Sequence, residues 1–162
     1  MDAVKKENKK IIKFPINKEW EKELTFSSTG SIANTIDNYC IILSNHEAFK
    51  DKITLNELSN QEEFDGKTIQ QIDYDNIQRI IEKEYGIYNE KKVASAIRSI
   101  ANEHKYHPII NYLNSLSWDG IKRADTAFAD YFGAAYTEYN SMCLRLILFG
   151  AIERVFNPRL QI

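Results

Sequence analysis

The 162-residue sequence has little glycine and proline, with six and three residues respectively. It contains no G-x-x-x-x-G-K-[S/T] pattern, so the usual loop that holds a nucleoside triphosphate is missing. It also contains no C-x-x-C, H-E-x-x-H or G-x-S-x-G pattern. These absences predict a protein that is not an enzyme, with no catalytic residues, no metal ligands and no cofactor.

Cysteine and long apolar runs are scarce as well. Cys40 and Cys143 lie inside apolar helical patterns, which is typical of reduced thiols in a cytoplasmic protein. The first 13 residues lack the apolar segment of a signal peptide. The longest apolar run, residues 146–152, is too short to cross a bilayer. The sequence therefore predicts a cytoplasmic protein with no membrane partner.

Charge of one sign is not in excess, because the formal net charge is −2. DNA binding would therefore need a local basic patch. Residues 1–16 are rich in lysine and predict a basic flexible tail, with a phosphate-binding arm as the alternative. Residues 17–158 contain the apolar residues of one core, since 43% of the whole chain is apolar. Residues 159–162 are expected to be a truncated C-terminus.

Apolar residues recur at helical spacing over most of residues 17–158, which predicts a mainly α fold, a single helical domain. A small β-hairpin is expected near residues 52–70, where Ile53 and Leu55 alternate with polar residues. Helices are expected after Asn17, over 32–43, from Asp73 or Asp75 to Tyr85, over 90–105, from Pro108, over 125–132 and over 137–156. Residues assigned to the core include Ile36, Tyr39, Ile77, Ile81, Val93, Ile97, Ile109, Leu116, Phe128 and Phe132.

Gly86 is expected to end the helix at Tyr85, and Asn89 is expected to cap the helix that begins at Glu90. These two helices have the outline of a helix–turn–helix. On the second helix, Lys91, Ser95, Arg98 and Asn102 lie opposite the apolar stripe. These residue types contact DNA phosphates and base edges. An ordinary solvated helix face is the alternative interpretation.

Three acidic residues, Glu62, Glu63 and Asp65, lie close together in the expected hairpin. Paired carboxylates can bind Mg²⁺ or act in acid–base chemistry. Neither a histidine, a lysine nor a glycine-rich loop accompanies them, so a solvated turn is the favoured interpretation.

The stretch from His104 to Arg123 combines aromatic and basic residues. Its aromatic members are Tyr106, Tyr112 and Trp118, and its cations are Lys105, Lys122 and Arg123. Such a mixture can stack bases and contact phosphates of a single strand. A corner sealed by Trp118, with solvated charges around it, is the favoured alternative. His104 and His107 have the spacing of a metal-binding pair, but no third ligand is near in sequence.

This stretch also contains the pattern Tyr106-His107-Pro108, a short Tyr-Leu helix, and Leu116-x-Trp118-Asp119-Gly120. Together with Arg154-Val155-x-Asn157-Pro158, it resembles the virulence-associated protein E family of phages and pathogenicity islands. The resemblance extends over residues 30–158. It implies that the chain corresponds to the region that precedes the P-loop ATPase of a replicative helicase. Where the family continues into that ATPase motor, this sequence has a short segment after Pro158. An excised domain and a naturally shortened remnant both fit that expectation.

The resemblance therefore implies a non-catalytic N-terminal module of a replication protein, one that engages DNA or forms a collar. The DNA-contact candidates are Lys91, Ser95, Arg98, Asn102, Lys105, Lys122 and Arg123. The alternative is a protein-interaction domain that binds a host or phage protein or self-associates. In either case the apolar helix over 137–156 is expected to be buried all round or to pack against a second copy or an ATPase domain.

Overall fold

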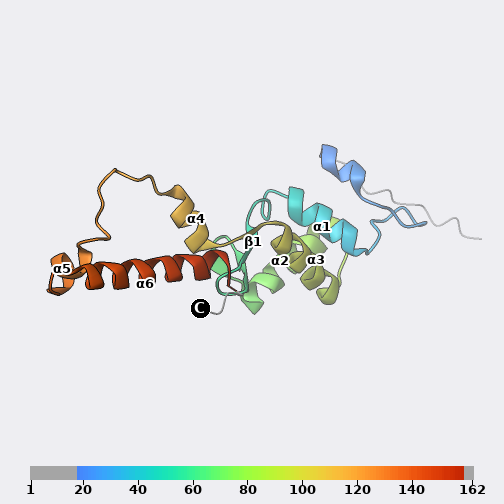
Figure 1. Ribbon diagram of the computed structural model, residues 1–162. Coiled ribbons are helices and arrows are strands. Elements are labelled where there is room, and N and C mark those ends of the chain that lie inside the picture. The colour runs from blue at the N-terminus through green and yellow to red at the C-terminus, as the bar shows by residue number, and fades with distance from the viewer. Residues whose placement is uncertain (1–17, 159–162) are drawn as a thin grey trace, which may run out of the picture. The chain divides into compact units, whose positions relative to one another are not determined.

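The computed structural model describes residues 18–158, and the chain is 55% helical with a small mixed sheet. The mainly α prediction is thus confirmed in outline, although the sheet is larger than the expected hairpin. The sequence predicts one domain over residues 17–158, whereas the chain divides into two compact units between Tyr106 and His107. The two units, unit 1 (described from residue 18 to 106) and unit 2 (107–158), are traced in Figure 1.

Unit 1 combines helices with a four-stranded sheet. Its helices are η1 (Glu19–Glu23, a 3₁₀ turn), α1 (Ile36–Asn45), α2 (Gln71–Tyr85) and α3 (Glu90–Glu103). Its strands are β1 (Ile53–Asn56), β2 (Gln61–Phe64), β3 (Lys67–Thr68) and β4 (Lys105–Tyr106), in the spatial order β3-β2-β1-β4.

The predicted hairpin is confirmed as the antiparallel pair β1 and β2, in which Ile53 lies opposite Phe64. Asp65 and Gly66 follow with φ of 53° and 73°, the positive values that a tight type I′ hairpin turn requires, and β3 pairs back onto β2. Strand β4 was not expected. It pairs in parallel with β1, so the predicted helix over 90–105 ends at Glu103 and Lys105 lies in the sheet.

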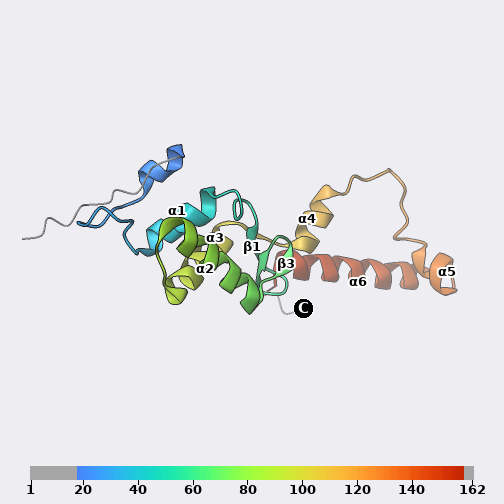
Figure 2. The same ribbon diagram turned by 180° about the vertical axis from the view of Figure 1, so that it is seen from behind.

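The helix α3 occupies the centre of unit 1, where it packs against α1, α2, β1 and β2 (Figures 1 and 2). Its predicted apolar stripe is confirmed, because each of its members is buried. The stripe consists of Val93, Ala96, Ile97, Ile100 and Ala101. It meets Tyr39, Ile42 and Leu43 of α1 and Ile77 and Ile81 of α2 in one hydrophobic cluster.

Two helix boundaries in unit 1 differ from the prediction because of local caps. Helix α1 begins at Ile36, since the Thr35 Oγ1 accepts the Asn38 N–H at 3.3 Å and the preceding residues are not helical. Ile36 is consequently exposed, which contradicts its assignment to the core. Helix α2 begins at Gln71, and Asp73 lies in its first turn, where its carboxylate accepts the Gln70 N–H at 2.8 Å.

Unit 2 contains α4 (Pro108–Ser115), α5 (Ala127–Phe132) and α6 (Glu138–Phe156), and α4 and α5 both pack on α6. Pro108 begins α4 as predicted, and Thr137 caps α6 by accepting the Asn140 N–H at 3.2 Å. Leu144 is the one buried apolar side chain in the part of unit 2 that the structure describes.

Several core assignments in unit 2 were wrong. Trp118 does not seal a corner, because 76% of its surface is exposed. Ile109, Leu116 and Phe132 are also exposed. Most of α6 is exposed too, so it is not buried all round within the described residues, and its packing against a second copy or an ATPase domain stays a prediction. Besides α6 itself, unit 2 has only two short helices and a long loop, which leave these side chains with too few neighbours to cover them.

The predicted tail over residues 1–16, the cap at Asn17 and the last four residues lie outside the described residues. Within residues 18–158, no helix has the length and apolar character that crossing a membrane requires.

Candidate nucleic-acid interface

Lys91, Ser95, Arg98 and Asn102 lie on one side of α3, which we call the α3 face. Their spacing of three or four residues brings them into line along the helix. Lys91, Arg98 and Asn102 are exposed and Ser95 is half-buried. The Arg98 Nη2 donates to the Ser95 Oγ at 3.3 Å, so two members of the α3 face already contact each other.

The core holds the α3 face in one orientation. The apolar stripe on the opposite side of α3 is buried, which prevents the helix from rotating. At its N-terminal end the Asn89 side chain accepts the Lys92 N–H at 3.0 Å. Before it, Gly86 ends α2 with a φ of 68°, a left-handed conformation that glycine adopts without strain. Both residues act as the sequence predicted.

Not every cation of α3 is available to a ligand. The Lys92 ammonium, next to Lys91 in sequence, donates to the Asn34 carbonyl oxygen. The Asn34 side chain in turn donates to the Tyr88 carbonyl oxygen at 2.8 Å. Lys92 therefore fastens the start of α3 to the segment before α1, whereas no carboxylate of residues 18–158 forms a salt bridge with Lys91 or Arg98.

The acidic residues of the hairpin serve the structure of unit 1, and the expectation of a solvated turn was wrong for Glu63. This carboxylate is only 7% exposed, and it accepts the Tyr106 hydroxyl at 2.7 Å and the Asn56 amide at 3.0 Å. Its hydrogen bond raises the pKa of Tyr106, because the phenol is favoured in its neutral form. Glu63 thereby ties β4 to the hairpin.

Glu62 lies on the opposite side of the strand and contacts α2. Its Oε2 accepts the Tyr74 hydroxyl at 2.6 Å. Burial, and then this hydrogen bond, raise the pKa of Tyr74 to about 12, while the positive charge of Arg98 acts in the opposite direction. Arg98 thus lies within electrostatic range of the half-buried Tyr74 phenol.

The other candidates lie outside α3. Lys105 lies in β4, where its Nζ is 3.3 Å from the Glu57 Oε1. Lys122 and Arg123 belong to unit 2, and the Arg123 guanidinium is 2.7 Å from the Asp119 carboxylate. The Ile121 N–H and this guanidinium lower the pKa of Asp119. Of the predicted aromatic and basic mixture, Tyr106 belongs to unit 1 and Trp118 to unit 2.

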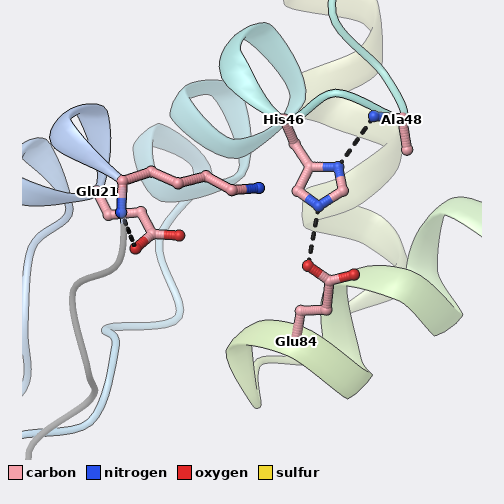
Figure 3. Close-up of polar contacts among 5 residues, drawn as sticks. Glu21, His46, Ala48 and Glu84 are labelled. Carbon is pink, nitrogen blue, oxygen red and sulfur yellow. Dashed lines mark hydrogen bonds and ion pairs between the residues drawn. The ribbon is translucent and has the colours of Figure 1, made fainter.

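Sequence reasoning missed His46, a buried histidine whose two ring nitrogens both have partners (Figure 3). Its Nδ1 accepts the Ala48 N–H at 3.2 Å, so its Nε2 carries the proton and donates to the Glu84 Oε2 at 2.9 Å. The ring also packs 5.1 Å from Phe49 and 6.0 Å from Tyr85. With both nitrogens engaged, His46 links α1 to α2 and has no free atom for acid–base chemistry.

Tyr85 and Glu21 lie in the same region. Burial raises the pKa of Tyr85, and the carboxylates of Glu21 and Glu84 raise it further. Glu21 is buried and accepts the Lys18 N–H at 3.0 Å. A sequence pattern could not indicate this cluster, because its members come from η1, α1 and α2.

A metal site finds no support in the geometry. Within residues 18–158, no three histidine, cysteine, aspartate or glutamate side chains are arranged to hold an ion. His107, one of the predicted histidine pair, caps α4 by accepting the Ile110 N–H at 3.3 Å on its Nδ1. Cys40 and Cys143 are both free thiols and half-buried.

Comparison with known proteins identifies the C-terminal part of the chain. Residues 113–162 match the family model of the virulence-associated protein E-like domain. The match includes the Trp118-Asp119-Gly120 turn and all of α6, and it confirms the resemblance over this segment. No curated protein matches the chain.

Proposed function

We propose that the chain is a non-catalytic, DNA-engaging module of a mobile-element replication protein related to the virulence-associated protein E family. In this proposal Lys91 and Arg98 contact DNA phosphates, and Ser95 and Asn102 donate or accept hydrogen bonds beside them. Arginine and lysine supply most phosphate contacts of DNA-binding helices, and short polar side chains add to them.

The observation that carries the proposal is the α3 face itself. Four polar side chains with suitable chemistry lie on one exposed side of a helix whose other side is fixed in the core. Because the helix is fixed by its buried stripe and its Asn89 cap, the binding groups are oriented before any ligand arrives, which lowers the entropy cost of binding. The match of residues 113–162 to the virulence-associated protein E-like domain supports the proposal, since the resemblance to that family implies a region beside a helicase motor.

The experiment is a fluorescence-anisotropy titration of the full chain with a labelled DNA duplex at about 0.1 M salt. The double variant Lys91→Glu with Arg98→Glu is expected to bind roughly tenfold or more weakly, because two phosphate contacts are lost and two repulsive charges added. The matched control is Arg79→Glu with Lys83→Glu, which makes the same charge change on exposed positions of α2. Equal weakening in both double variants would show that only net charge matters and would remove the α3 face from consideration.

A second candidate function is self-association, and the exposed apolar surface of α6 favours it. Leu146 is 72% exposed and Phe149 is 67% exposed, and Ile147 and Met142 are exposed as well. Monomeric proteins rarely expose so many large apolar side chains on one helix. A second copy of the chain that covers α6 would remove these side chains from water.

A further inference from the structure

Unit 2 contains an open hollow of about 510 Å³, which we call the Trp118 hollow. Its volume lies in the range of small-molecule and cofactor sites, roughly 300–1,000 Å³. The loop after α4 and the middle of α6 line it together. The residues that matter for its chemistry are Trp118, Lys122, Arg123, Asp125, Arg145 and Phe149.

The lining combines two exposed aromatic rings with three cations and a single carboxylate. Exposed aromatic rings stack on nucleobases, and cations beside them bind the phosphates that link those bases. The sequence pattern pointed to Trp118 and Lys122 for such a role. The structure adds Phe149 and Arg145 of α6 to the lining of the same hollow, and the pattern did not include these two residues.

Internal contacts hold the loop in this arrangement. The Trp118 Nε1 donates to the Ile121 carbonyl oxygen at 3.4 Å, and the Ile121 N–H donates to the Asp119 Oδ1 at 3.0 Å. On the other side, the Arg145 Nε donates to the Asp125 Oδ1 at 2.7 Å. Arg123 and Arg145 are therefore each paired with a carboxylate, and these ion pairs position the loop.

Lys122 differs from these two arginines. No carboxylate of the described residues lies within salt-bridge distance of its ammonium group. Its side chain is exposed, and it lines the same hollow as the Trp118 ring. The exposed indole can stack on the base of a nucleotide, and the unpaired cation in the same hollow can bind its phosphate.

We propose that the Trp118 hollow binds single-stranded DNA, with a base stacked on Trp118 and a phosphate on Lys122. A duplex is a poorer ligand, because its bases already stack on each other and are not available to the indole. The hollow is built from residues of unit 2 alone, so this inference does not depend on duplex binding by the α3 face of unit 1.

The two tryptophans of the chain allow a direct test. Trp20 packs 6.1 Å from Tyr85 in unit 1, whereas Trp118 lines the hollow. In the Trp20→Phe chain, Trp118 is the sole indole, and a 15-nucleotide oligothymidylate should quench its fluorescence to saturation. In the Trp118→Phe chain, which reports Trp20, the same oligonucleotide should cause no saturable quenching. Quenching of both chains, or of neither, would overturn the proposal.

Affinity for a labelled oligothymidylate, measured by anisotropy, provides a test that does not depend on the Trp20 change. Trp118→Ala should weaken binding roughly 5- to 150-fold, the value of one base–aromatic stack. Lys122→Glu should also weaken it, while the matched control Lys50→Glu, at an exposed position of unit 1, should not.

The same series separates this site from the α3 face. Lys91→Glu with Arg98→Glu should leave Trp118 quenching unchanged even where it abolishes duplex binding. Unchanged affinity in Trp118→Ala, or quenching by a duplex as strong as by the single strand, would overturn the assignment.

Discussion

At the scale of single residues, unit 1 is held together by buried polar groups that each have a partner. Asn38 is fully buried, and its side chain forms four hydrogen bonds. The Asn38 Oδ1 accepts the Thr25 N–H and hydroxyl, and its Nδ2 donates to the carbonyl oxygens of Thr25 and Ala33. No buried side-chain nitrogen or oxygen of residues 18–158 lacks a partner. Such satisfied groups specify one packing arrangement, because every alternative would leave some of them unpaired.

Tyr74 gives a prediction at this scale, because its pKa is raised to about 12 and its ordinary value is about 10. A group with a raised pKa in the folded state stabilises the protein fully below pH 10, and the contribution is lost as pH rises towards 12. Tyr74→Phe should therefore make the free energy of unfolding fall less steeply between pH 10 and 12. Urea unfolding at a series of pH values measures this slope.

The control for this measurement is Tyr88→Phe, which removes an exposed phenol from the connection before α3. Its slope should match that of the wild type. A Tyr74→Phe protein with the wild-type slope would mean that burial and the hydrogen bond to Glu62 do not raise the pKa of Tyr74.

At the scale of elements, local signals predicted the helices of unit 1 well, because caps and periodicity are read from neighbouring residues. Gly86, Asn89 and the stripe around Ile97 are examples. Strand β4 could not be predicted in this way, since Lys105 and Tyr106 become a strand only by pairing with β1, about 50 residues earlier. The α3 face was predicted by the same periodicity, whereas the link between His46 and Glu84 depends on the packing of α1 on α2.

The cap of α3 gives a prediction for an element. Asn89→Ala removes the acceptor of the Lys92 N–H, and the free energy of unfolding should fall by about 0.5–2 kcal/mol. Because α3 lies at the centre of unit 1, this loss should appear in the main unfolding transition when urea unfolding is followed by circular dichroism.

Asn89→Asp is the matched control, since aspartate also accepts the hydrogen bond of a helix N-terminus. It should retain most of the stability. An Asn89→Ala protein as stable as the wild type would contradict the view that this cap fixes the α3 face.

At the scale of the whole molecule, the division into two units explains why core prediction succeeded in one half and failed in the other. In unit 1 the apolar stripes of α1, α2 and α3 meet one another, so helical spacing identified the buried residues. In unit 2 the stripe of α6 meets only short helices, and equally apolar side chains such as Leu146 stay exposed. Periodicity shows which side chains share a face but not whether another surface covers that face.

Self-association through α6 is the prediction at this scale. The mass of the wild-type chain, measured by sedimentation equilibrium, should rise with concentration, because a second copy covers the exposed apolar side chains. Leu146→Glu with Ile147→Glu should keep the chain at the monomer mass. Lys91→Glu with Arg98→Glu, which adds two glutamates in unit 1, should associate like the wild type. A wild-type chain that stays monomeric at every concentration would contradict this role for α6.

The most direct test of DNA engagement by the α3 face is the salt dependence of duplex binding. Each phosphate contact contributes about −0.9 to the slope of log affinity against log salt concentration. Replacing Lys91 and Arg98 by glutamine removes both charges without adding repulsion, so the slope should become less steep by about 2. The same replacements at Arg79 and Lys83 should leave the slope unchanged. Identical slopes in the wild-type and Lys91→Gln, Arg98→Gln proteins would show that neither side chain contacts a phosphate.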